Sequence, residues 1–110
     1  MKIQTPKAKN AEHLDYIRNL PCLVCGDNTA TEAAHVRRAD DRAAKKITGM
    51  GIKPRDCWTV PLCSRHHRRQ HEVGEAHFWD QWGIDPVFKA MAFWIHSGDI
   101  EAGEQIAKQR

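Results

Sequence analysis

Apolar side chains recur at helical spacing near the start of the chain. Leu14 and Ile17 lie three positions apart with Tyr16 beside them, so one face of a helix would be apolar. Asn10 precedes this stretch and can cap its first turn. The pattern predicts a first helix over about 10–19.

Further helices are predicted over about 75–108. Phe78 and Trp82 share one helical face, and Pro86 is well suited to the first position of the next helix. That helix has an apolar stripe that we expect to be buried: Val87, Phe88, Met91, Trp94 and Ile95. So small a domain needs its aromatic side chains for packing, so we predict these as core. The final segment, EAGEQIAKQR, is polar, and we expect it to fray.

The centre of the chain changes from extended to helical patterns. The segments TEAAHV at 31–36 and CWTVPL at 57–62 predict two short strands, and the basic stretch 38–55 between them predicts a long loop. SRHHRRQHEV predicts a short helix that Ser64 caps and Gly74 ends. The sequence therefore predicts one α+β domain over 1–110, with a ββα core over about 22–73 surrounded by additional helices.

Length and composition narrow the class of protein. The chain has 110 residues, of which 41% are hydrophobic and 28% charged, as in ordinary globular domains. No apolar stretch is long enough to cross a bilayer, and the N-terminal MKIQTPKAKNAEH lacks the apolar segment of a signal peptide. We expect a cytoplasmic protein with no membrane partner.

The formal net charge of +3 is unevenly distributed. Residues 1–36 hold 4 Lys and Arg against 4 Asp and Glu, residues 37–69 hold 10 against 3, and residues 70–110 hold 3 against 7. A basic centre between a neutral and an acidic flank is typical of a surface that binds a polyanion. On charge alone, a solvated loop and helix face explains the pattern equally well.

The 4 Cys and 7 His are many for so short a chain, and in a reducing compartment they indicate metal binding before disulfides. Cys22 and Cys25 flank two residues, and Cys63 and His66 repeat that spacing. Two such pairs supply the four tetrahedral ligands that structural zinc prefers. Cys57 is the alternative fourth ligand, although it has no partner at this spacing. We expect a structural zinc ion whose binding helps the domain to fold.

Three further histidines are candidates for catalysis. His67 and His71 are four residues apart in the predicted helix, so both project from one face and can bind one divalent ion. His35 lies on the first predicted strand, just before the basic segment. The alternatives are a solvated helix face for the pair and a structural role for His35. The remaining histidines are expected to be structural or exposed: His13, His77 and His96.

The order of these features resembles the HNH (His-Me finger, ββα-metal) endonucleases. That family has a cysteine knuckle, a strand with a histidine, a long loop, a second strand, and a knuckle that opens a metal-binding helix. The similarity covers about residues 12–98. The chain most resembles small phage and prophage members of the family, such as the RecA-dependent nuclease Ref. The matching segments are PCLVCG at 21–26, EAAHV at 32–36, GMGIKPRD at 49–56 and VPLCSRHHRRQH at 60–71.

The resemblance implies a role for each matching residue. His35 matches the general base, and His67 and His71 match the ligands of a single catalytic ion, Mg²⁺ or Mn²⁺. Ala34 stands where many members carry a further metal ligand, so Glu32 or Asp56 would have to supply that oxygen. The middle Asn of the family pattern has no clear equivalent here, and Asp56 is the nearest polar residue. The residues that match the structural zinc knuckles are Cys22, Cys25, Cys63 and His66.

The function implied is a metal-dependent DNA endonuclease or nickase that hydrolyses phosphodiester bonds and leaves 5′-phosphate and 3′-hydroxyl ends. The alternatives are a zinc-stabilised nucleic-acid-binding module without catalysis, and a protein-interaction adaptor. The expected partners are DNA, and either a second copy of the chain or a phage or host recombination protein. The basic residues expected to hold the DNA backbone are Arg37, Arg38, Lys53, Arg55, Arg65, Arg68 and Arg69.

Overall fold

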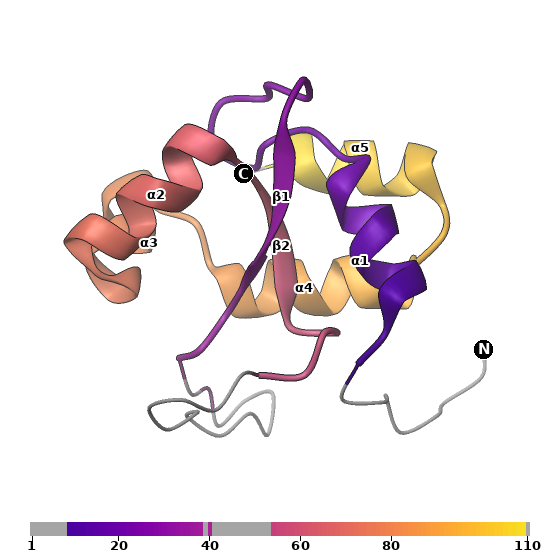
Figure 1. The fold of residues 1–110 in the computed structure, drawn as a ribbon, viewed down its shortest axis with the longest axis horizontal. Helices are drawn as coiled ribbons and strands as arrows, with labels where there is room; N and C mark the ends of the chain where they lie inside the picture. Colours follow the sequence, from indigo (N-terminus) through magenta and orange to yellow (C-terminus); the bar gives the residue numbers. More distant parts are fainter. Residues whose placement is uncertain (1–8, 39, 41–53, 110) are drawn as a thin grey trace.

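The computed structural model describes residues 9–38, 40 and 54–109. These residues form an α+β structure of one antiparallel hairpin and five helices (Figure 1). In chain order the elements are α1 (Ala11–Arg18), β1 (Thr31–His35), β2 (Thr59–Cys63), α2 (Ser64–Val73), α3 (Glu75–Trp82), α4 (Pro86–Ile95) and α5 (Ile100–Lys108). The predicted fold class is therefore confirmed at the level of α+β. The predicted loop over 38–55 lies largely outside the described residues.

The hairpin is the centre of the structure. Strands β1 and β2 pair antiparallel from Thr31 opposite Cys63 to His35 opposite Thr59. Every residue of β2 is buried, whereas β1 is only partly covered. Figure 1 shows α2 and α3 on one side of the hairpin and α1 and α5 on the other. Helices therefore cover both sides of the hairpin, which explains why β2 is buried along its whole length.

The second strand begins later than the sequence predicts. The predicted strand covered 57–62, but β2 starts at Thr59. The preceding residues turn instead: the Trp58 N–H donates to the Arg55 carbonyl at 2.9 Å, and the Thr59 hydroxyl donates to the Asp56 carbonyl at 2.8 Å. A β-branched and aromatic composition does not distinguish such a turn from a strand.

Helix α4 buries only part of the predicted stripe. Val87, Ala90 and Phe93 are fully buried, whereas Phe88 is 39% exposed and Ile95 57% exposed, so the predicted stripe is wrong at those two positions. The sequence PVFKAMAFWI is apolar almost all round, so periodicity cannot select a face. Lys89 joins α4 to the C-terminal segment, because its ammonium group donates to the Ile106 carbonyl at 2.6 Å and to the Gln109 carbonyl at 2.5 Å.

The C-terminal segment is ordered rather than frayed. Helix α5 is capped by Asp99, whose carboxylate accepts from the Ala102 N–H at 3.0 Å. The Tyr16 hydroxyl of α1 also donates to the Asp99 carbonyl at 2.9 Å. These bonds dock α5 beside α1 and add it to the core.

No helix among the described residues is long and apolar enough to cross a membrane.

Candidate functional site

Four side chains from two separate segments of the chain converge at one end of the hairpin. Their ligand atoms all lie within 4.8 Å of one another, and they are Cys22, Cys25, Cys63 and His66. The first two come from the turn after α1, and the last two span the junction of β2 and α2. The Leu23 N–H donates to the Pro61 carbonyl at 2.9 Å, which fastens the turn to β2.

The dimensions of this cluster fit a zinc ion. The Cys25 and Cys63 sulfurs are 3.9 Å apart, and the His66 Nδ1 atom is 3.2 Å from the Cys63 sulfur and 3.8 Å from the Cys22 sulfur. Tetrahedral zinc bonds of about 2.3 Å to sulfur and about 2.0 Å to nitrogen separate two sulfurs by about 3.8 Å, and a sulfur and a nitrogen by about 3.5 Å. The four predicted ligands therefore can hold zinc, and buried Cys57 lies outside the group.

The surroundings of these side chains shift their pKa values, and a metal ion binds only their deprotonated forms. Burial raises the pKa of the Cys22 thiol. Burial acts in the same direction on Cys25, but the Asp27 N–H and the neighbouring thiols outweigh it and lower the pKa of Cys25. Burial also lowers the pKa of His66, assisted by the charge of Arg65, and so favours the neutral imidazole that a metal ligand must be.

His35 is the last residue of β1, at the opposite end of the strand from the Cys/His cluster, and the Asp56 carboxylate holds its ring. Its Nε2 atom is 2.9 Å from Oδ1 of Asp56, and the side chains are 15% and 11% exposed. The second Asp56 oxygen accepts from the Asn10 N–H at 2.7 Å, at the start of α1. An ionised carboxylate only accepts hydrogen bonds, so this bond places the proton on Nε2 and leaves Nδ1 of a neutral His35 as an acceptor.

A second histidine–carboxylate pair joins β1 to α2. His67 Nδ1 is 2.7 Å from Oε1 of Glu32, and the Ser64 hydroxyl donates to the other Glu32 oxygen at 2.9 Å. These two bonds lower the pKa of Glu32 and keep it ionised. The imidazole rings of His67 and His71 lie 4.9 Å apart between centroids, as their spacing predicts. Ser64 is therefore the first residue of α2 and a partner of Glu32, not the predicted cap.

The two pairs lie on opposite faces of β1. Glu32 and His35 are three positions apart, and alternate strand residues point to opposite sides. Thr31 shares the face of His35, and its hydroxyl donates to the Leu20 carbonyl beyond α1 at 2.8 Å. Hydrogen bonds within the described residues link each histidine to its own carboxylate and do not link the two pairs. Within the described part of the chain, the Cys/His cluster is also the one group of three or more candidate metal ligands.

Most of the predicted DNA-binding residues are exposed, and Lys53 lies outside the described residues. The exposed set is Arg37, Arg38, Arg55, Arg65, Arg68 and Arg69. The Glu75 carboxylate accepts from the N–H groups of Arg37 at 2.9 Å and Arg38 at 2.8 Å, so the backbone after β1 is tied to the first turn of α3. This bond has no signature in the sequence, since Glu75 looks like an ordinary first-turn acid.

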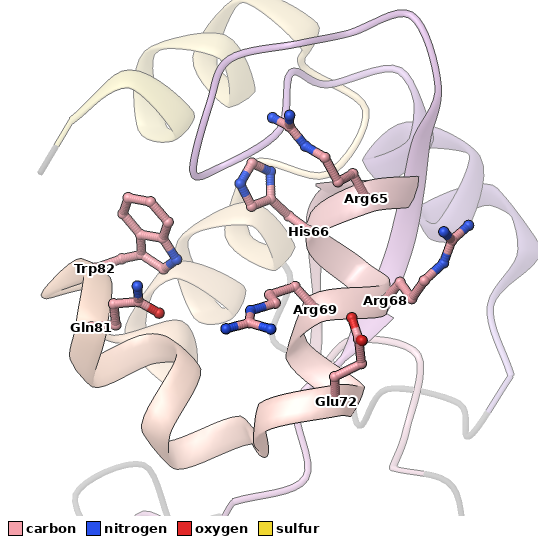
Figure 2. Close-up of a pocket in the computed structure, with 7 residues that line it drawn as sticks. All are labelled: Arg65, His66, Arg68, Arg69, Glu72, Gln81 and Trp82. Atoms are coloured by element: carbon pink, nitrogen blue, oxygen red, sulfur yellow. The ribbon is translucent and has the colours of Figure 1, made fainter.

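Sequence reasoning also missed a hollow of about 310 Å³ between α2 and α3 (Figure 2). Trp82 was expected in the core, but it is 38% exposed at this hollow. Its ring meets that of His66 edge to face, with centroids 5.9 Å apart. The lining residues are Arg65, His66, Arg68, Arg69, Glu72, Gln81 and Trp82.

Comparison with known proteins gives the family and no activity. No curated protein and no solved structure matches the chain. A family model described as "Protein of unknown function (DUF968)" matches residues 2–97. The match spans most of the sequence, and the chain belongs to the DUF968 family.

Proposed function

We propose that the protein is a metal-dependent DNA endonuclease or nickase of the HNH type. The observation that carries the proposal is the pair formed by His35 and Asp56 at 2.9 Å, on a hairpin that also presents Glu32 and His67. The resemblance to the HNH family implies catalytic roles for the same two histidines, His35 and His67. The fold supplies the strand–strand–helix order that this assignment needs.

His35 acts as the general base. Asp56 holds the ring by its Nε2–H, so Nδ1 can take a proton from an attacking water molecule. The negative charge of Asp56 then stabilises the imidazolium that forms. Asp56 thus positions the base, a task that the resemblance gives to the middle Asn of the family pattern. The charge adds a stabilisation that an amide would lack.

Glu32 and His67, with His71 beside them, are the residues that would hold the catalytic ion. A carboxylate oxygen and an imidazole nitrogen 2.7 Å apart are suitable neighbours around one divalent cation. Glu32 shares its strand face with Ala34, so it supplies an oxygen on the side where Ala34 offers none. When bound, Mg²⁺ or Mn²⁺ stabilises negative charge on the phosphate and on the departing oxygen.

The exposed arginines hold the DNA backbone without reading its sequence. Arg65, Arg68 and Arg69 follow the candidate zinc ligand Cys63 along α2, and the Glu75 carboxylate holds the backbone at Arg37 and Arg38. Guanidinium groups match phosphate oxygens geometrically and keep their charge at any physiological pH. Binding through them weakens steeply as salt is added.

A plasmid-nicking assay tests the proposal. Purified protein is incubated with supercoiled DNA and Mg²⁺ or Mn²⁺, beside His35→Ala and the exposed-histidine control His77→Ala. We expect nicking by the wild type and by His77→Ala, and a loss of about 10²- to 10⁴-fold in His35→Ala with zinc content and circular dichroism unchanged. Equal nicking by His35→Ala would refute the assignment of the base.

A zinc-stabilised binding module without catalysis is the second candidate. It is favoured by the separation of the two histidine pairs and by the single group of candidate metal ligands in the described part of the chain. Binding of duplex, single-stranded or branched DNA without cleavage in any divalent ion would support it over the nuclease.

A further inference from the structure

We propose that the hollow between α2 and α3 binds one unpaired nucleotide of single-stranded DNA, with its base on Trp82 and its phosphate on Arg69. The inference rests on the proposed nuclease function and names the form of DNA that the protein prefers. It concerns a site distinct from the two histidine pairs, since neither His35 nor His67 lines the hollow.

The exposure of Trp82 has no explanation in packing. Phe78 and Trp79 on the same helix are fully buried and already supply the contact of α3 with the core. Trp82 follows one turn later and is 38% exposed, and its ring lies edge to face with the His66 ring at 5.9 Å between centroids. An indole that keeps part of its surface in water at the rim of a hollow offers a platform on which a base can stack.

Charge and direction favour an anion beside that platform. Three guanidinium groups and one carboxylate line the hollow. In Figure 2, the Arg69 side chain extends between α2 and α3 toward Gln81, whereas Arg68 leaves the other side of α2. Arg69 therefore can contact a phosphate while a base lies on Trp82, and the Gln81 amide offers a donor and an acceptor to the edge of that base.

The size and walls of the hollow select an unpaired nucleotide over a duplex. A volume of about 310 Å³ is near the lower limit of sites that bind small ligands, about 300–1,000 Å³. Two helices joined by Gly74 alone form its walls, so a double helix cannot enter. Within a duplex, both faces of a paired base are covered by neighbouring bases. An unpaired base has a free face that can stack on Trp82.

The candidate zinc site and the hollow share His66. His66 is one of the four candidate zinc ligands and also lines the hollow, with its ring against Trp82. At the turn, Gly74 adopts a φ of +90°, which allows α3 to reverse beside α2. The platform is therefore preorganised, which reduces the entropy lost when a nucleotide binds.

Fluorescence anisotropy with labelled single-stranded DNA and a duplex of equal length tests the site, in the zinc-loaded protein without added divalent ion. We expect Trp82→Ala to weaken single-strand binding by about 5- to 150-fold and to leave duplex binding unchanged. Trp82→Phe keeps a stacking ring and should restore most of the affinity. Phe88→Ala is the matched control, because Phe88 is equally exposed but lies on α4, away from the hollow.

A second variant tests the phosphate contact. Arg69→Gln should weaken single-strand binding and reduce its salt-dependence slope by about 0.7, the value for one lost phosphate contact. The inference is overturned if Trp82→Ala, with intact zinc content, binds single strands as the wild type does, or loses single-strand and duplex binding equally. Loss of nicking in His35→Ala with unchanged Trp82→Ala binding would remove this site and retain the nuclease. Trp82-dependent binding without any nicking would do the reverse.

Discussion

At the scale of single residues, the histidines of this chain differ in their hydrogen-bond partners and their burial, and therefore in their chemistry. His66 lies among three thiols, His35 and His67 each meet a carboxylate, and His77 is exposed. His13 differs from all of these because it is fully buried, with Nδ1 2.7 Å from the Ser97 hydroxyl and its other ring nitrogen without a hydrogen-bond partner among the described residues. Burial lowers the pKa of His13 to about 4, against a smaller opposing effect of the Asp56 charge.

His13 should make the stability of the protein depend on pH. Its folded pKa of about 4 lies below the value of 6.5 expected when the chain is unfolded, so the unfolded state takes up the proton first. Stability is therefore complete above pH 6.5 and falls as the pH drops from about 6.5 to about 4, by up to about 3 kcal/mol. Urea unfolding at pH 7.5 and pH 5 should show a smaller loss in His13→Gln than in the wild type.

The exposed-histidine variant His77→Gln is the control for this experiment. Acid also protonates the zinc ligands, but it does so in all three proteins, so only the difference between them reports on His13. An equal loss of stability in His13→Gln and His77→Gln would show that His13 is not the residue responsible.

At the scale of elements, the sequence predicts where helices and strands occur better than which faces they bury. Helix α2 ends where the sequence predicts, because Gly74 follows it, but it begins at Ser64 itself rather than after it. The stripe predicted for α4 was wrong at Phe88 and Ile95, because its sequence is apolar almost all round and long-range bonds such as that of Lys89 to α5 help to hold the helix. Such long-range bonds carry no local signal that a sequence pattern can reveal.

Helix α5 packs so closely at position 103 that a larger residue would have to displace its neighbours. A Cβ atom added to Gly103 would lie 2.5 Å from the Tyr16 hydroxyl oxygen and 2.6 Å from a Leu20 methyl group. We expect Gly103→Ala to lower the free energy of unfolding by about 1–3 kcal/mol despite the better helix propensity of alanine. Denaturant titration measures this change. The exposed control on the same helix, Gln105→Ala, should stay within about 0.5 kcal/mol of the wild type. An unchanged or raised stability in Gly103→Ala would contradict the close contact.

At the scale of the whole molecule, the candidate site was partly predictable. The four Cys and His of the metal cluster could be named from their spacing alone, because a repeated two-residue gap encodes a knuckle locally. The partners of the catalytic histidines could only be named as options, since Asp56 lies 21 residues from His35 and Glu32 lies 35 from His67. The hollow beside Trp82 depends on the angle between two helices, which no sequence pattern specifies.

Zinc should be a condition of folding for the entire domain. The binding free energy of a structural zinc ion is about 10–16 kcal/mol. The free energy of unfolding of a typical domain is of the same size, about 5–15 kcal/mol. We expect Cys63→Ala to lose zinc and unfold, and Cys57→Ala to retain one zinc per chain and its circular dichroism spectrum. Metal analysis after dialysis against a mild chelator distinguishes the two. Retention of zinc by Cys63→Ala, or its loss from Cys57→Ala, would show that the cluster is composed differently.

The bond between Tyr16 and Asp99 joins residues 83 positions apart, and the one between His13 and Ser97 joins residues 84 apart. Contacts of such separation require closing a loop that includes most of the chain, so they are slow to form unless shorter loops close first. The hairpin and α2 can close around zinc early, which leaves the docking of α1 on α5 as a late event. Weakening that docking, as in Gly103→Ala, should then accelerate unfolding while the refolding rate stays the same.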